Sequence, residues 1–149
     1  MKLSPPLRLE EDRVSLVKGI KDNLIDVIVS DHIPEDEESK RLPFAQAATG
    51  AIGIETLLPL ALEMHHNESL PLNKIVETLT INPAKILQIN KGTLKKGSDG
   101  DICILDLDAP WIVKAENLKS KSKNTAIEGR KLQGKVLMTF LNGELVFNQ

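Results

Sequence analysis

The sequence predicts an α/β fold, a helix-and-strand unit followed by a small β unit, and three observations support this. Apolar residues recur at helical spacing from about Glu10 to Asp22, and a short β-branched run, Ile25–Ser30, follows at once. Near residues 90–97 the pattern changes to strand-like runs separated by glycine turns. The chain has 149 residues, whereas a complete (β/α)8 barrel needs at least about 200.

The first helix is supported by charge at both ends. Acidic residues, starting with Glu10, favour its N-terminus, and Lys18 and Lys21 favour its C-terminus. The segment before it is extended, because Ser4 precedes a Pro-Pro pair and is excluded from the α region. A helix that leads into a β-branched run is one unit of an α/β sheet, so we expect residues 25–30 to form a parallel strand.

Residues 31–53 have no period and contain prolines and glycines, which predicts a long loop of a length usually found in functional or disordered segments. Three helices are expected after it. The first covers about 54–66, and Pro59 must lie near its start or kink it, because proline lacks a backbone donor. The second begins near Pro71, and the third is short, capped by Asn82 and finished by about residue 92.

The C-terminal part predicts a small β unit. Strands are expected at 101–107, 136–141 and 144–147, with Trp111–Val113 as a candidate fourth. Asn142-Gly143 lies between the last two and is the strongest short hairpin signal. The chain therefore divides into residues 1–92 and 93–149.

Composition excludes several partner classes. The net charge of −2 provides no basic field for nucleic acid, and three Phe, one Trp and no Tyr leave few rings for base stacking. No apolar stretch approaches the roughly 18 residues of a membrane span, and no basic-then-apolar leader opens the chain. The single cysteine, Cys103, permits no internal disulfide and fits a reducing compartment, so a cytoplasmic protein is expected.

The most informative candidate site is the string SDHIP at residues 30–34. It places the Asp31 carboxylate and the His32 imidazole where the predicted strand ends, and catalytic groups converge at such ends in barrels. A carboxylate there can ligate a metal or move a proton. From the residues alone, the alternative is favoured: Asp31 caps the next turn and His32 packs against the loop, since Asp-His is a common dipeptide.

Other candidates have simpler explanations. The acidic run 35–38 suits a solvated face, and the glycine-containing segment 49–53 suits a turn as well as a ligand contact. His65 and His66 are adjacent on a helix and therefore point about 100° apart. The lysine-rich stretch 119–123 suits a mobile surface loop better than a phosphate site. Three scattered histidines and one cysteine do not make a complete zinc site.

An ordered set of strings resembles the C-terminal part of dihydroorotases, in the amidohydrolase superfamily. The resemblance covers essentially the whole chain. Its strings are SPPLR at 4–8, IDVIVSDHIP at 25–34, GIETLLPL at 53–60, TINPAKIL at 80–87, Lys91-Gly92, residues 97–105, SKSKNT at 120–125 and residues 134–146.

The resemblance implies a (β/α)8 metallo-hydrolase barrel with a small β-sandwich. This chain would supply its last strand, Ile25–Ser30, its last helices and part of the sandwich, with most zinc ligands lying upstream of Met1. In the family, zinc-activated water attacks a cyclic amide, interconverting dihydroorotate and carbamoyl-aspartate in pyrimidine biosynthesis. Asp31 matches the aspartate that carries the proton to the leaving nitrogen. The segment Ala48–Gly50, which includes Thr49, matches the segment whose backbone contacts the pyrimidine ring.

Two departures from the family pattern open an alternative. Ser4 stands where active members usually carry Asn, and Glu35 where they carry His, and both positions contact substrate. Glu35 would repel an anionic substrate at short range. Catalytically silent dihydroorotase-like proteins that associate with aspartate transcarbamoylase show such losses, so a non-catalytic structural subunit is the alternative, and a hydantoinase or allantoinase is the third reading. A smaller departure is Ala126-Ile127, because Pro-Phe is commoner there.

Two expectations hold under either reading. The isolated chain should not hydrolyse dihydroorotate or hold zinc stably, because most metal ligands are absent from it. It should also self-associate or require the remaining barrel portion, because an unpaired barrel strand exposes open edges and apolar faces.

Overall fold

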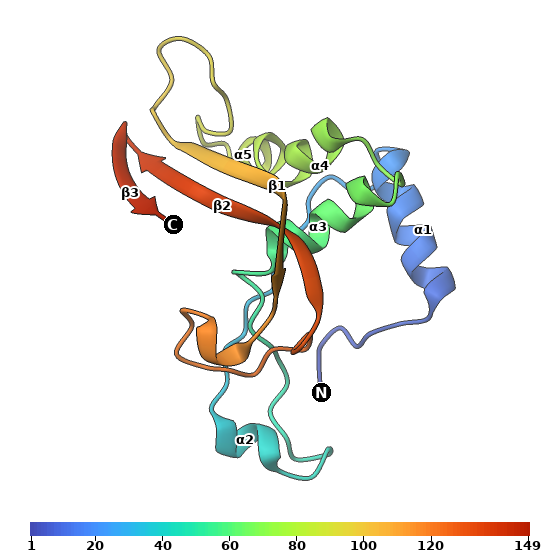
Figure 1. Cartoon of the computed structure of the whole chain (residues 1–149). Coiled ribbons are helices and arrows are strands. Elements are labelled where there is room, and N and C mark those ends of the chain that lie inside the picture. The colour runs from blue at the N-terminus through green and yellow to red at the C-terminus, as the bar shows by residue number, and fades with distance from the viewer.

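The computed structural model describes all 149 residues, and its helices and its sheet lie on different sides of the molecule (Figure 1). The helices α1, α3, α4 and α5 gather beside a curved three-stranded sheet, and the short α2 lies apart from them on the long loop. The elements are α1 (Glu10–Lys21), α2 (Glu37–Arg41), α3 (Leu57–His66), α4 (Leu72–Leu79), α5 (Ile81–Ile86), β1 (Ile102–Ile112), the 3-10 turn η1 (Ala115–Asn117), β2 (Lys131–Leu141) and β3 (Glu144–Asn148).

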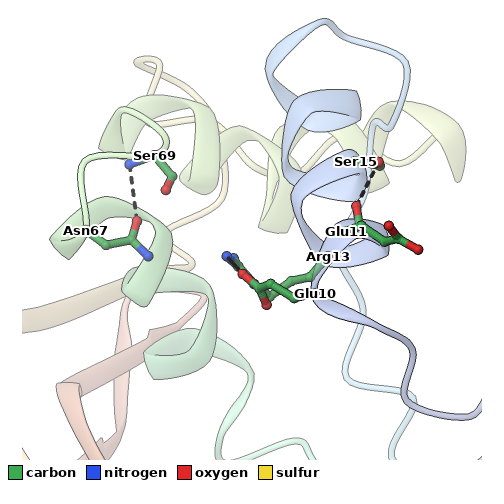
Figure 2. A network of polar contacts seen from close by, with 6 residues as sticks. All are labelled: Glu10, Glu11, Arg13, Ser15, Asn67 and Ser69. Carbon is green, nitrogen blue, oxygen red and sulfur yellow. Dashed lines mark hydrogen bonds and ion pairs between the residues drawn. The ribbon is translucent and has the colours of Figure 1, made fainter.

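Helix α1 confirms the first predicted helix. Its surface carries a two-pronged ion pair in which the Arg13 Nε lies 2.9 Å and 3.0 Å from the two carboxylate oxygens of Glu10. The hydrogen bond from Arg13 lowers the pKa of the Glu10 carboxyl. Figure 2 shows this pair projecting from α1 toward the loop after α3, where the Ser69 amide donates to Asn67. The pair is exposed, so it contributes little stability.

Helix α3 begins at Leu57, three residues later than predicted. A start at residue 54 would place Pro59 in the helix interior, where its missing N–H removes a hydrogen bond. A start at Leu57 puts Pro59 in the first turn, whose N–H groups have no intrahelical partner in any case. The Thr56 carbonyl accepts the first bond, from the Leu60 amide at 3.1 Å.

The predicted N-cap of the short helix that follows α4 is wrong. Helix α5 covers Ile81–Ile86 and follows Thr80 directly, so Asn82 lies inside the helix rather than before it. The Asn82 Nδ2 instead donates to the Asp26 carbonyl at 3.0 Å. The Thr80 hydroxyl donates back to Val76 at 2.7 Å, so it closes the end of α4 instead of opening α5.

Residues 25–30, the predicted parallel strand, belong to no helix and form no strand ladder. Within it, the Ile25 amide donates to Gly19 and the Ile28 amide to Thr78. The side chain of Val29 is 70% exposed. The β-branched residues favour an extended backbone, but a strand also needs a neighbour about 4.8 Å away, and this chain places none there.

The β unit is confirmed and is antiparallel, in the order β1-β2-β3. Asn142 and Gly143 both have positive φ, 52° and 83°, which is the backbone of the type I′ turn that their sequence predicts. Trp111 and Ile112 belong to β1 rather than to a further strand, since β1 continues past an irregularity between Asp106 and Pro110. None of the helices combines the length and apolar character that a membrane span requires.

Charged groups fasten the start of β1. The Asn142 amide donates to Asp101 at 2.8 Å, and the Lys91 ammonium lies 2.5 Å from Asp101 and 2.7 Å from Asp99. These contacts lower the pKa of Asp101, mainly through the Asn142 amide, and raise the pKa of Lys91. The contribution of Asp101 to stability is therefore present above its unfolded pKa and lost in acid. That of Lys91 is present below its unfolded pKa and lost in base.

Two small hydrophobic clusters hold the fold together. One packs Ile20, Ala61, Leu70 and Ile75 among the helices. The other joins Ile52 of the first portion to residues of the second, Val113, Leu118 and Leu132. The portions 1–92 and 93–149 therefore share a buried contact. Whether they are separate domains remains a prediction.

The molecule exposes more surface than its size requires. Its accessible surface is 10300 Å² for 16.4 kDa, against about 7500 Å² for a compact protein of this mass. Only 18 of the 149 residues are buried. Much apolar side-chain surface of this chain is therefore exposed to solvent.

Candidate functional site

A cleft of about 430 Å³ contains three of the residues singled out from the sequence: Ser4, Asp31 and Gly50. Its walls come from the N-terminal segment, the extended residues 28–31, the loop 50–53 and α3. Most of the lining is apolar, with side chains such as Leu57, Leu60 and Met64. An apolar cleft with a few polar groups is the usual form of a small-molecule site.

Asp31 is the acidic residue of this cleft, and it follows the extended segment directly. Its φ of 43° is left-handed, which aspartate tolerates better than most residues. The side chain is exposed and makes no hydrogen bond or ion pair within the chain, so it does not cap a turn. Its carboxylate is therefore available to a ligand, a metal or a proton.

His32 has a structural contact instead. Its Nδ1 accepts from the Gly53 amide at 3.1 Å and from the Ile54 amide at 3.3 Å. Because Nδ1 accepts, the ring proton of the neutral imidazole is on Nε2. His32 thus fastens the residues just before α3 beside Asp31.

The loop at Gly50 lies directly against the Asp31 segment. Gly50 has φ 138°, and a Cβ there would lie 2.6 Å from Ile33, so only glycine fits. A Cβ on Gly53 would lie 2.7 Å from the Ser30 carbonyl oxygen. Ala51 and His32 form a parallel β-bridge, and the Ile33 amide donates to the Ala51 carbonyl at 2.9 Å.

The other two predicted substrate-binding residues do not line the Asp31 cleft. Glu35 lines a neighbouring cleft of about 660 Å³ together with Lys40 and Asn124, and Thr49 lines neither cleft. The Glu35 backbone is fixed by the 122–124 segment: its amide donates to Asn124 at 3.4 Å and its carbonyl accepts from Ser122 at 2.5 Å. In this chain, Glu35 and Asp31 therefore face different spaces.

Sequence reasoning missed three residues that build the site. Lys40 and Asn124 both donate to the Gly50 carbonyl, at 2.8 Å and 3.2 Å. The Glu55 carboxylate accepts from the amides of Lys119 and Ser120, at 2.9 Å and 3.0 Å. The lysine-rich segment is thus fastened to the loop, contrary to the mobile surface loop predicted. No local pattern signals these contacts, because most of the partners are far apart in sequence.

No cluster of three or more His, Cys, Asp and Glu side chains could hold a metal ion. Zinc in proteins usually has at least three protein ligands, and the Asp31 cleft offers one carboxylate. The rings of His65 and His66 lie away from this cleft, with centroids 5.7 Å apart. The residues of this chain therefore do not fit a zinc ion by themselves.

Comparison with known proteins decides the family. The model of the amidohydrolase family matches residues 3–146. The chain belongs to the amidohydrolase family. Among curated relatives of this amidohydrolase chain, the dihydroorotase of Ehrlichia chaffeensis is 44% identical over 146 residues, covering 98% of the chain and 33% of the relative. The dihydroorotase of Aquifex aeolicus is 42% identical, with 98% and 34% covered.

Solved structures show the same partial coverage. The L-hydantoinase of Arthrobacter aurescens superimposes with a TM-score of 0.90 at 35% identity, over 99% of this amidohydrolase chain and 34% of the other. The dihydropyrimidinase of Brevibacillus agri gives a TM-score of 0.93 at 25% identity, with 99% and 33% covered. The chain spans about a third of the length of these proteins. The resemblance to part of a dihydroorotase and the α/β fold class are confirmed.

Proposed function

We propose that the chain is the C-terminal portion of a dihydroorotase-type cyclic amidohydrolase. The single observation that carries the proposal is the meeting of Asp31 and Gly50 in one cleft. The chain is 44% identical to a dihydroorotase and 35% identical to the L-hydantoinase of known structure. The higher identity supports the dihydroorotase substrate class over the hydantoinase class. Pyrimidine biosynthesis and a cytoplasmic location are expectations of the same proposal.

Asp31 would carry the proton of the reaction. When water adds to the ring carbonyl, its oxygen forms the new C–O bond and its proton passes to the carboxylate. The ring C–N bond then breaks, and the proton returns from Asp31 to the leaving nitrogen, so atoms and charges balance. A carboxylate without an internal partner, such as Asp31, is free to accept and release this proton.

Zinc activates water in the complete site of the family, and its main ligands would come from outside this chain. Asp31 is the one residue of the cleft that could join them. We therefore expect the isolated chain to bind zinc weakly or not at all.

The test is a chimera in which this chain replaces the matching third of the Ehrlichia chaffeensis dihydroorotase. We expect the chimera to hydrolyse dihydroorotate. The isolated chain should show no turnover even with added zinc, because it has one candidate ligand. The loss of absorbance when the dihydroorotate ring opens measures the turnover of the chimera and of the isolated chain. An inactive but folded, zinc-loaded chimera would contradict the proposal, and so would substantial turnover by the isolated chain.

Ser4 and Glu35 support a second candidate, a non-catalytic subunit associated with aspartate transcarbamoylase. Ser4 lies in the Asp31 cleft, so the residue that replaces the usual Asn is at the site itself. If the chimera is inactive and the double variant Ser4→Asn, Glu35→His restores turnover, this second candidate is favoured. Hydrolysis of hydantoin or dihydrouracil in preference to dihydroorotate would favour the third reading, a hydantoinase or allantoinase.

The exposed surface supports an association partner, which we propose to be the remaining barrel portion or, in its absence, a second copy. The extended residues 25–30 have no strand neighbour, and Leu7 and Val29 are 82% and 70% exposed. We expect the isolated chain to sediment as dimers or larger species at micromolar concentration. Adding the complementary barrel portion should convert these to a one-to-one complex. A stable monomer with a sharp cooperative melt would contradict this expectation.

A further inference from the structure

Lys40 occupies an unusual environment for a charged side chain. Its ammonium donates to three backbone carbonyls, those of Lys2, Ala48 and Gly50, at 3.2 Å, 2.7 Å and 2.8 Å. Three donors are all that an ammonium has. It forms no ion pair with any carboxylate. All three hydrogen-bond donors of the Lys40 ammonium are therefore bonded to backbone carbonyls.

Two of these three backbone groups belong to pieces of the Asp31 cleft. The Lys2 carbonyl lies two residues before Ser4 and also accepts from the Gly50 amide at 3.1 Å. The Gly50 carbonyl is held a second time, by Asn124. Lys40 therefore joins the segment that carries Ser4 to the glycine loop, and it lines the neighbouring cleft rather than the cleft of Asp31.

The glycine loop in turn holds Asp31. Ala51, directly after Gly50, is bridged to His32, and Gly50 itself lies against Ile33 with no room for a side chain. On the other side of Asp31, Ser30 lies against Gly53 of the same loop, so both chain neighbours of Asp31 contact the loop that Lys40 fixes. Since Asp31 has left-handed φ, its place depends on these neighbours more than on its own preference.

We propose that Lys40 is a positioning residue for Asp31, acting through the Gly50 carbonyl and the Ala51–His32 bridge. The inference rests on the proposed function. Without the ammonium, the Gly50 carbonyl keeps only the Asn124 donor, so the loop that supports Asp31 is held less firmly. A displacement of about 1 Å at a catalytic group can cost about 100-fold in rate.

The experiment is a double-mutant cycle in the chimera. Lys40→Met is expected to lower kcat about 10- to 100-fold. In the Asp31→Asn background, Lys40→Met should change kcat less than about twofold, because the group it positions is gone. A purely structural role would lower the remaining activity in both backgrounds equally, and that result would overturn the proposal.

Lys123→Met is the matched control. Lys123 also donates to a backbone carbonyl, that of Leu118 at 2.6 Å, and lines the same cleft as Lys40 without touching Gly50. It should leave kcat within about twofold of the parent. An equal loss in both lysine variants would overturn the proposal.

The kcat of Lys40→Arg and the amide exchange rate of Ile33 test the same role of Lys40. If Lys40→Met does not fold, Lys40→Arg keeps the charge, but its planar guanidinium cannot direct donors at three converging carbonyls, so an intermediate kcat is expected and an unchanged kcat overturns the proposal. In the 149-residue chain, amide exchange at Ile33 should accelerate in Lys40→Met and not in Lys123→Met. If the chimera without substitutions is inactive, both the proposed function and this inference are contradicted. If that chimera is active and Lys40→Met does not change its kcat, only the inference is contradicted.

Discussion

Replacing Asp31 by Asn is expected to lower kcat for dihydroorotate hydrolysis by the chimera about 10²–10⁴-fold. Asn has the same shape but cannot take up a proton from water or return one to the leaving nitrogen. KM should change little, since the charge of Asp31 is used on the proton and not on uniform substrate binding. Steady-state kinetics at several pH values measure both constants.

Asp26→Asn is the control for the charge change. Asp26 lies in the same extended segment and is exposed, but it does not line the cleft. Its variant should keep kcat within about twofold of the parent. Equal losses at both positions would mean that the effect comes from the net charge of the segment, and the role of Asp31 would then be refuted.

Replacing Ile75 by Ala is expected to cost about 2–5 kcal/mol in free energy of unfolding. Ile75 is fully buried and packs with Ile20, Ala61 and Leu70, so its truncation opens a cavity between α1, α3 and α4. The cluster is small, so few other contacts remain to compensate. Urea unfolding of the 149-residue chain and the variant at one fixed protein concentration, followed by circular dichroism, gives the change.

Val76→Ala is the matched variant for this cluster. Val76 is the next residue of α4 and is 40% exposed. It should cost less than about 1 kcal/mol, because part of its surface already meets water and alanine favours a helix. Equal costs at both positions would show that α4 does not pack as described.

Much of the fold could be predicted because its signals are local. Helix α1 follows from its spacing and end charges, and the hairpin follows from Asn142-Gly143, whose positive φ values the structure confirms. The errors arise where the local structure depends on residues that are distant in the sequence. Residues 25–30 have the composition of a strand but no neighbour to pair with, and Asn82 turns away from its expected cap to reach Asp26.

The candidate site divides in the same way. Asp31 stands out because a carboxylate follows a β-branched run, and the structure places it with Ser4 and Gly50. Lys40 does not stand out, since one lysine in a charged helix resembles any solvated residue. Its importance comes from the carbonyls of Lys2 and Gly50, which are 38 and 10 residues away along the chain. Local sequence patterns do not predict hydrogen bonds between residues that are this far apart along the chain.

The excess of uncovered surface has a consequence for the amount of this polypeptide in a cell. Extended edges and apolar side chains in contact with water are the features that chaperones bind and that proteases reach first. A copy of this chain whose apolar surface stays uncovered would therefore be a substrate for chaperones and proteases, and its lifetime in a cell would be short.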